Sequence, residues 1–179
     1  METAVRRLRT ARSTPSVDTA RLTVGFVDLV GFTTLSGRIS TRELAALVER
    51  FEETAHEVAT ARDGRVVKLI GDEVMFVTVR AAAACDIALA LVERFSGDAS
   101  ITPRGGLALG ALLLRGGDYY GPVVNLAARL AELAVPGELL VTPEVAADAA
   151  AGGLRFPPAG RRMLKGFDDP VTLFTVERS

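Results

Sequence analysis

A connection of only three residues, Gly71-Asp72-Glu73, separates two runs of β-branched and apolar residues at positions 65–70 and 74–79. A glycine next to an aspartate in so short a link is typical of a β-hairpin turn. The two runs are therefore predicted to be neighbouring antiparallel strands. The other predicted elements precede or follow this hairpin in the chain.

The rest of the chain alternates between strand and helix patterns. Residues 21–29 form a buried-strand run, and residues 41–62 carry apolar side chains at helical spacing up to Asp63-Gly64. The further elements predicted are a helix over 81–95, a strand over 102–114 broken by Gly105, Gly106 and Gly110, a helix over 123–133, a strand over 138–141, a short helix from Pro143, a Gly/Pro-rich loop over 152–160 and a strand over 171–176.

This order predicts an α+β fold. Its centre would be a ferredoxin-like or palm-like βαββαβ core, in which helices cover one face of a mostly antiparallel sheet, with added C-terminal elements. Residues 1–20 are polar, contain four arginines and are bounded by Pro15, so we expect a flexible N-terminal leader or linker. Residues 21–179 then form one domain. No apolar stretch is long enough to cross a bilayer, so we expect no membrane insertion.

Composition removes several classes of function. The formal net charge of the 179 residues is -1, which argues against nucleic acid as a partner. The chain has one histidine, His56, and one cysteine, Cys85, which nearly excludes a zinc site of imidazole and thiolate ligands. Any metal site must use carboxylate and backbone oxygens, which suit magnesium, manganese or calcium. A lone cysteine also fits a reducing compartment, so we expect a cytoplasmic protein.

Two aspartates occupy positions where strands end. Asp28 lies in the run FVDLV, and Asp72 lies in the hairpin connection. Because the first strand and the hairpin would be neighbours at the centre of the sheet, their carboxylates are expected to meet at one edge. Such a pair is stabilised by a hard cation, and two-metal phosphoryl chemistry needs this arrangement. The alternative is that each aspartate caps a local turn, which is weaker for Asp28 because charged groups are rarely buried without partners.

The segment after Asp28 is a candidate phosphate-binding turn. It contains Val30, Gly31, Phe32 and Thr33, where a strand ends in a glycine-containing turn before a helix. Backbone N–H groups in such a turn can point at phosphate oxygens. Beside two acidic residues, this feature favours a nucleoside triphosphate as the ligand.

At this point the chain resembles the class III adenylyl/guanylyl cyclases. The resemblance is carried by four stretches in the same order as in the family: residues 26–33 (FVDLVGFT), 67–76 (VKLIGDEVMF), 118–129 (DYYGPVVNLAAR) and 164–167 (LKGF). Together they extend over nearly all of residues 21–176. The resemblance implies that residues 21–179 are a cyclase homology domain that makes 3′,5′-cyclic AMP and pyrophosphate from ATP.

The resemblance also implies a role for individual residues. Asp28 and Asp72 match the aspartates that hold two divalent metal ions, Mg²⁺ or Mn²⁺. Lys68 matches the residue that recognises the base, and Asp118 matches its partner. A lysine donor and an aspartate acceptor complement the N1 acceptor and the amino donor of adenine. Guanine has a donor at N1 and an acceptor at O6, so this pair favours ATP.

Three more residues take roles from the same resemblance. Asn125 and Arg129, four apart on a predicted helix, match the pair that steadies the ribose and the transition state. Lys165 matches the lysine that grips the terminal phosphates. In the family these groups come from both chains of a head-to-tail dimer, so a homodimer with two shared active sites is expected. The strand over residues 104–110 departs from the family pattern, and no role is assigned to it.

Two alternatives remain open from the sequence. The first is another cyclase: a guanylyl cyclase that uses GTP, or a diguanylate cyclase of related fold. Lys68 and Asp118 argue against both. The second is a non-catalytic nucleotide-sensing or dimerisation module, against which the complete set of predicted site residues argues.

Overall fold

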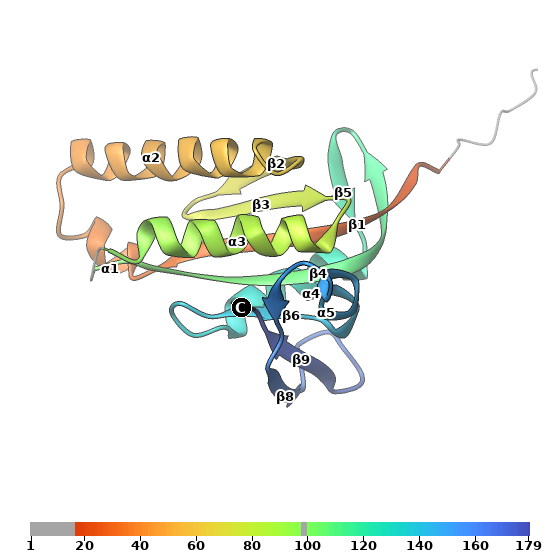
Figure 1. The fold of residues 1–179 in the computed structure, drawn as a ribbon. Coiled ribbons are helices and arrows are strands. Elements are labelled where there is room, and N and C mark those ends of the chain that lie inside the picture. Colours follow the sequence, from red (N-terminus) through yellow and green to blue (C-terminus); the bar gives the residue numbers. More distant parts are fainter. Residues whose placement is uncertain (1–16, 98–99) are drawn as a thin grey trace, which may run out of the picture.

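The computed structural model describes residues 17–97 and 100–179 (Figure 1). Within these ranges the helices are α1 (Phe32–Ser36), α2 (Thr41–Thr60), α3 (Ala81–Phe95), α4 (Pro122–Leu133) and α5 (Pro143–Ala149). The strands are β1 (Thr19–Val30), β2 (Gly64–Ile70), β3 (Glu73–Thr78), β4 (Thr102–Arg115), β5 (Asp118–Tyr120), β6 (Leu139–Val141), β7 (Leu154–Arg155), β8 (Pro158–Arg162), β9 (Val171–Thr175) and β10 (Glu177–Arg178).

The main sheet has the strand order β2-β3-β1-β4-β6-β9-β8. Its first four strands pair in antiparallel fashion, so the βαββαβ segment from β1 to β4 forms the predicted ferredoxin-like core. The sheet continues through β6, which runs parallel to β4, and β5 pairs with β4 outside the main path. The predicted α+β class and mostly antiparallel sheet are confirmed.

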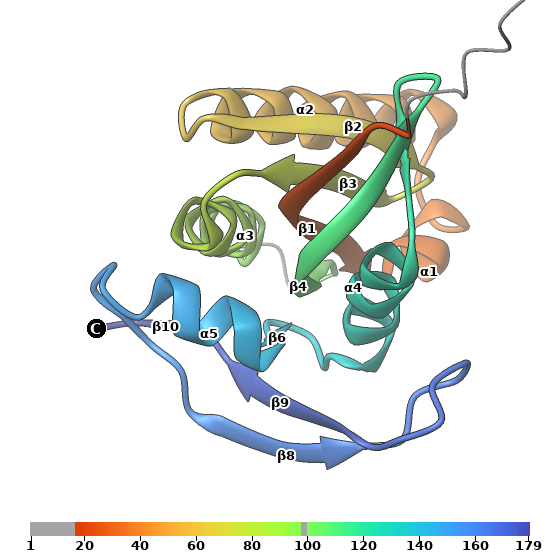
Figure 2. The same ribbon diagram turned by 90° about the vertical axis from the view of Figure 1, so that its right-hand side faces the viewer.

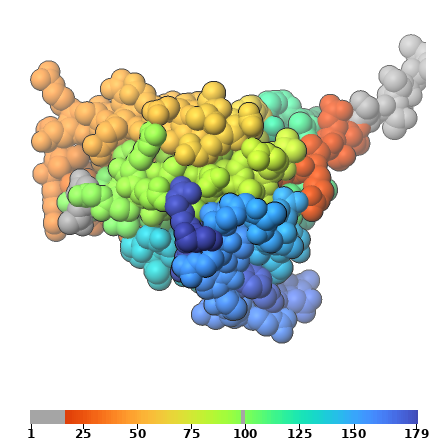
Figure 3. Space-filling view, viewed as in Figure 1, coloured from red at the N-terminus to blue at the C-terminus, as the bar shows by residue number. Residues whose placement is uncertain are grey.

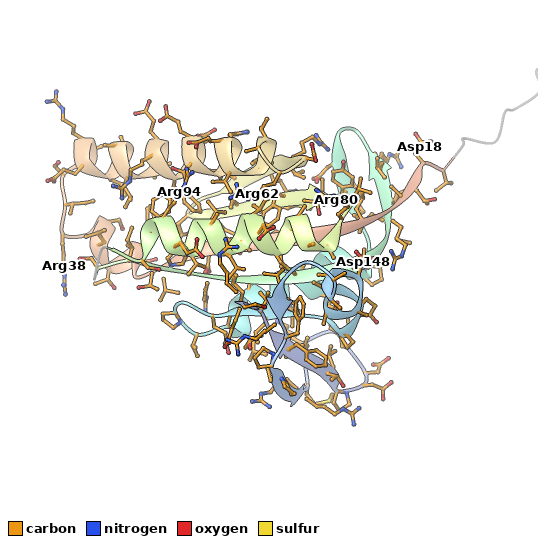
Figure 4. All side chains as sticks on the ribbon, in the orientation of Figure 1. Asp18, Arg38, Arg62, Arg80, Arg94 and Asp148 are labelled. Atoms are coloured by element: carbon orange, nitrogen blue, oxygen red, sulfur yellow. The ribbon has the colours of Figure 1, made fainter. Side chains whose placement is uncertain are left out.

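Helices α2 and α3 cover one face of this sheet. Their apolar side chains, including Phe51 and Leu91, pack against strand residues such as Val27 and Phe76 in the largest buried cluster. The N-terminus of α2 is fixed by Ser40, whose hydroxyl accepts from the backbone of residue 43 in a capping box. The N-terminus of α3 is capped from another element, because the carboxylate of Asp148 on α5 accepts from the N–H of Ala81 over 3.2 Å (Figure 4).

Helix α4, one of the elements added after the core, packs on the opposite face of the sheet (Figure 2). The contact is very close. A Cβ atom added at Gly106 of β4 would lie 2.4 Å from the carbonyl oxygen of Ala127 and 2.4 Å from the backbone nitrogen of Ala131. The expected break of this strand at its glycines is wrong, because β4 is continuous from Thr102 to Arg115. Gly106 instead provides the space in which α4 sits on the sheet.

The C-terminal region extends the sheet beyond the core. Strands β8 and β9 pair and project from the body of the domain as its lower blue part (Figure 3). The loop expected over 152–160 therefore contains β7 and the start of β8. These are short strands in which four of the five residues of β8 are exposed, and such strands lack the apolar alternation that reveals a strand in sequence.

The expected leader over residues 1–20 lies outside the described residues up to position 16. The described part shows β1 beginning at Thr19, two residues before the predicted domain boundary. In the described ranges, none of the helices is both long and apolar enough to cross a membrane.

Candidate active site

The two predicted metal ligands, Asp28 and Asp72, lie at the same end of the central strands. Asp28 is near the end of β1, and Asp72 is in the turn between β2 and β3. In the β1–β3 register Asp28 is opposite Glu73, and the N–H of Leu29 donates to the carbonyl oxygen of Asp72 over 3.2 Å. The two aspartates come together because β1 pairs with β3, so the end of β1 meets the hairpin turn.

Burial and neighbouring carboxylates at this edge disfavour the ionised forms of Asp72 and Glu73. Burial raises the pKa of Asp72, and the charge of Asp28 raises it further. Burial also raises the pKa of Glu73 to about 7, with contributions from Asp28, Asp72 and Glu132. A cation at this edge would relieve the repulsion among these groups.

The donor set at this edge suits a hard divalent cation. Two carboxylates and nearby backbone carbonyls are oxygen ligands, which Mg²⁺ and Mn²⁺ prefer. No group of three or more His, Cys, Asp or Glu in the described parts of the chain is arranged to hold a metal. The aspartates would therefore fill only part of a coordination shell. The remaining positions suit water and the phosphate oxygens of a nucleotide, as is usual for Mg²⁺.

Arg104 of β4 belongs to this edge, although no role was expected for its strand. It is opposite Asp28 in the β1–β4 register, and it donates from Nε to Oδ1 over 2.9 Å and from Nη2 to Oδ2 over 3.2 Å. These hydrogen bonds raise the pKa of Arg104 above its usual value. The strand register that brings the two residues together is not visible in the sequence, which is why Arg104 was missed.

The predicted phosphate-binding turn begins where β1 ends at Val30. Gly31 has φ of +91° and is the N-cap of α1, whose first residues are Phe32 and Thr33. A Cβ atom at Gly31 would lie 2.4 Å from the carbonyl oxygen of Ser100, so both the space and the backbone angle require glycine. Among the described residues, no side chain caps α1. Its first N–H groups can therefore donate to an anion.

The predicted base-reading residues form an ion pair. Nζ of Lys68 lies 2.6 Å from Oδ2 of Asp118. The hydrogen bond from Lys68 lowers the pKa of Asp118, as does the hydrogen bond that Oδ1 accepts from the N–H of Tyr119 over 2.8 Å. Lys68 is on β2 and Asp118 is on β5, strands that are not neighbours in the sheet. The ion pair between the two side chains thus links two strands that do not pair with each other.

A β-bulge in β2 determines which face of the sheet Lys68 occupies. Val66 is opposite Phe76 of β3, and Lys68 is opposite Met75, so Val67 is an extra residue without a position of its own in the register. Met75 belongs to the cluster on the α4 face, so Lys68 is on the side of the sheet where β5 and α4 lie. The sequence gives no sign of this bulge, because no glycine or proline marks it.

Asn125, Arg129 and Lys165 line one hollow of about 500 Å³. Asn125 and Arg129 lie one turn apart on α4, and Lys165 lies in the loop between β8 and β9. Nη1 of Arg129 donates to Oε2 of Glu132 over 2.7 Å on the same helix. Neither Asp28 nor Lys68 is in the wall of this hollow. One chain therefore brings the predicted residues together in three groups and does not gather all of them in one cavity. The groups are an acidic edge (Asp28, Asp72 and Glu73), the Lys68–Asp118 ion pair and an α4 hollow (Asn125, Arg129 and Lys165).

The comparison with known sequences identifies the family. A sequence profile described as the adenylate and guanylate cyclase catalytic domain matches residues 15–178. The chain belongs to this cyclase family. The predicted resemblance is thereby confirmed over almost the whole domain.

Two relatives of this cyclase domain are adenylate cyclases. The one from Glutamicibacter nicotianae is 43% identical over 149 residues, which are 82% of this chain and 37% of the relative. The one from Streptomyces coelicolor (strain ATCC BAA-471 / A3(2) / M145) is 47% identical over 122 residues, which are 68% of this chain and 32% of the relative. The cyclase domain thus spans about a third of the length of these curated relatives.

Solved cyclase structures have the same fold. The adenylyl cyclase CyaB from P. aeruginosa superposes with a TM-score of 0.80 at 26% identity, over 91% of this chain and 97% of that one. The catalytic core of a rhodopsin-guanylyl cyclase with converted specificity, in complex with ATPalphaS, gives a TM-score of 0.82 at 24% identity, over 91% and 98%. The chain therefore has the fold of these cyclase structures over 91% of its length.

Proposed function

We propose that this domain converts ATP to 3′,5′-cyclic AMP and pyrophosphate at active sites shared between two copies of the chain. The observation that carries the proposal is the Lys68–Asp118 pair, whose charged atoms lie 2.6 Å apart. The pair offers one donor and one acceptor side by side, and two relatives that match 82% and 68% of this chain are adenylate cyclases.

Recognition of the base follows from this pair. Adenine presents an acceptor at N1 beside a donor at its amino group, so Lys68 would donate to the first and Asp118 would accept from the second. Guanine presents a donor at N1 and an acceptor at O6. The N1 donor of guanine would then face the donor Lys68, and its O6 acceptor would face the acceptor Asp118. These groups would be left without hydrogen bonds, which disfavours GTP.

The triphosphate would be held by groups at both ends of the site. Asp28 and Asp72 would hold two Mg²⁺ or Mn²⁺ ions, and a cation on Asp28 would compete with the guanidinium of Arg104. When bound, such ions lower the pKa of the 3′-hydroxyl and neutralise charge on the leaving group. Lys165 and the N–H groups after Val30, from Gly31 to Thr33, would bind the terminal phosphates.

The reaction forms a bond between the 3′-oxygen and the α-phosphorus and breaks the bond between that phosphorus and the oxygen bridging to the β-phosphate. Pyrophosphate leaves with the bond electrons, and the hydroxyl proton passes to a phosphate oxygen or to water. Arg129 would donate to the α-phosphate oxygens as charge develops, and Asn125 would orient the ribose.

A homodimer would complete each site. Asp28 is absent from the wall of the hollow that contains Arg129, which supports an arrangement in which one copy supplies the acidic edge and its partner supplies the α4 hollow. Two-fold symmetry would then give two equivalent sites. We propose a cytoplasmic location on the basis of the single, buried Cys85.

Product formation from ATP and from GTP, with Mn²⁺ present and then chelated, tests this function. Metal-dependent cyclic AMP with little cyclic GMP is the expected result. Asp28→Asn should abolish it, whereas Asp63→Asn, the same change at an exposed carboxylate, should not. Cyclic GMP as the main product would overturn the base assignment, and nucleotide binding without any cyclic product would indicate a binding module.

A further inference from the structure

A second pair of side chains joins β2 to β5 beside the base-reading pair. Nη2 of Arg65 donates to the hydroxyl of Tyr119 over 2.6 Å, and the guanidinium carbon lies 5.2 Å from the centroid of the tyrosine ring. Tyr119 is buried, with 8% of its surface exposed, in the cluster on the α4 face. Arg65 and Tyr119 therefore connect the same two strands as Lys68 and Asp118, one step further from the acidic edge.

The bulge at Val67 makes this double connection possible. Arg65 and Lys68 are three positions apart, and in a regular strand they would lie on opposite faces of the sheet. Because Val67 is an extra residue, Arg65 is opposite Val77 and Lys68 is opposite Met75, two positions apart on β3. Both basic residues therefore lie on the face where β5 lies.

Strand β5 has little other support toward β2. It has three residues, and within the described part of the chain it pairs only with the end of β4. It follows a turn formed by Gly116 and Gly117, which have φ of +60° and +79°. The ion pair between Lys68 and Asp118 is half exposed, and such pairs contribute only about 0–1 kcal/mol. The hydrogen bond from Arg65 is also charge-assisted, and the hydroxyl that accepts it belongs to a buried ring, so it adds a second connection that is less open to solvent.

Tyr119 also acts on Asp118 directly, because its backbone N–H donates to Oδ1 of that carboxylate over 2.8 Å. The tyrosine therefore holds the base-reading carboxylate through its backbone and holds its strand through its side chain. Movement of Tyr119 would change the position of Asp118 relative to Lys68.

We infer that Arg65 and Tyr119 form a positioning pair, which holds Asp118 opposite Lys68 and thereby sets the preference for adenine over guanine. This inference rests on the proposed base-reading role of Lys68 and Asp118. Neither positioning residue needs to touch the nucleotide. Their contribution is the fixed separation of a donor and an acceptor, on which rejection of the wrong base depends.

The test is the substitution Tyr119→Phe, which removes the hydroxyl and keeps the ring. We expect the ratio of kcat/KM for ATP to kcat/KM for GTP to fall about tenfold, as for loss of roughly one hydrogen bond to a charged group. The loss should be mainly in KM for ATP, with kcat changed by less than about threefold, because the groups that act on the α-phosphate are untouched. Tyr120→Phe, at the exposed neighbouring tyrosine, is the matched control and should keep the parent ratio.

Arg65 provides a variant that does not disturb the core. Arg65→Met should lower the ratio as Tyr119→Phe does, and Arg65→Lys, which keeps a donor, should restore part of it. The double variant Arg65→Met/Tyr119→Phe should be no worse than Arg65→Met alone, because Arg65→Met already removes both the hydrogen bond and the contact with the ring. Additive losses, or a parent ratio in both single variants, would overturn the inference and leave the proposed cyclase function intact.

Binding of ATP and GTP, measured by competition with a fluorescent adenine nucleotide, separates the two proposals. If the parent binds ATP in preference to GTP but makes no cyclic product, the proposed function fails. Loss of that preference in Tyr119→Phe would then still support the positioning pair. A parent chain that binds ATP and GTP equally would overturn the inference, because it would have no base preference to maintain.

Discussion

Arg104 and Asp28 face each other across the β1–β4 register, and the guanidinium donates to both carboxylate oxygens, over 2.9 and 3.2 Å. The remaining nitrogen, Nη1, donates to the carbonyl oxygens of Glu132 and Ala134 at the C-terminal end of α4, over 2.9 and 3.1 Å. One side chain thus connects the acidic edge with the helix that carries Arg129. A change at Arg104 should therefore be felt both in stability and in the response to metal.

Arg104→Gln should lower the free energy of unfolding by about 1–3 kcal/mol in the absence of divalent ions. The reason is that the partly buried Asp28 carboxylate loses two charge-assisted hydrogen bonds and keeps its acidic neighbours. Added Mn²⁺ should reduce the deficit, because the ion supplies the missing positive charge. Urea denaturation with and without Mn²⁺ measures both effects, with Arg42→Gln at an exposed helical position as control. An unchanged unfolding free energy would show that the contact does not contribute in solution.

Glu73 should make the metal-free protein less stable as pH rises. Its pKa is raised from 4.5 to about 7, so the folded state binds more protons than the unfolded state between these values. The free energy of unfolding therefore falls as pH increases from about 5 to 7, and the contribution of Glu73 no longer changes above pH 8. Glu73→Gln should remove this slope and be more stable than the parent at pH 8. Urea unfolding at pH 5 and pH 8 in the presence of a chelator measures it, and equal slopes in both proteins would contradict the prediction.

Mixing two inactive variants should restore activity if the sites are shared. Asp28→Asn damages the acidic edge, and Arg129→Ala damages the α4 hollow. In a mixed dimer one site would have both defects and the other would have none. An equal mixture should reach about a quarter of the parent activity, because half of the dimers are mixed and each has one intact site. Two copies of the same variant provide the control, and a mixture as inactive as its components would show that each site is built within one chain.

Gly106→Ala should displace α4. The new Cβ would meet backbone atoms of Ala127 and Ala131 at 2.4 Å, which flexible side chains cannot relieve. We expect a loss of about 1–3 kcal/mol of stability, as for other overpacked sites, and a fall in kcat because α4 carries Arg129. Gly97→Ala is the control, since open space surrounds that glycine. Thermal unfolding and cyclic AMP formation test the pair of variants, and similar behaviour of the two would show that α4 can adjust without loss.

The sequence predicted those parts of the fold that have a strong local pattern. Helix α3 was predicted over its observed range because apolar residues fill it, and the hairpin was predicted from its Gly71-Asp72 turn. The side of the sheet on which α4 packs was not predictable, because it depends on the close approach at Gly106. Nor was β8, whose polar residues form an exposed edge strand.

The site was predictable to the extent that it follows from motifs. Asp28 and Asp72 were expected together because the end of one strand meets the turn of its neighbour, and they lie there. The pairing of Lys68 with Asp118 came only from the family resemblance, since 50 residues separate them. Arg104 and Arg65 were missed because their partners are set by register and by a bulge, which are properties of paired strands and not of either strand alone.

If Lys68 and Asp118 read the base as proposed, the extra residue at Val67 makes base preference depend on strand length as well as on residue identity. A relative with the same lysine and aspartate, but with one residue fewer in β2, would place that lysine or its neighbouring arginine on the wrong face. Insertions and deletions in this strand would then alter the choice of nucleotide even when the lysine and the aspartate are unchanged. Substrate preference among such proteins is therefore better compared by counting residues between the glycine that opens β2 and the lysine than by matching the lysine alone.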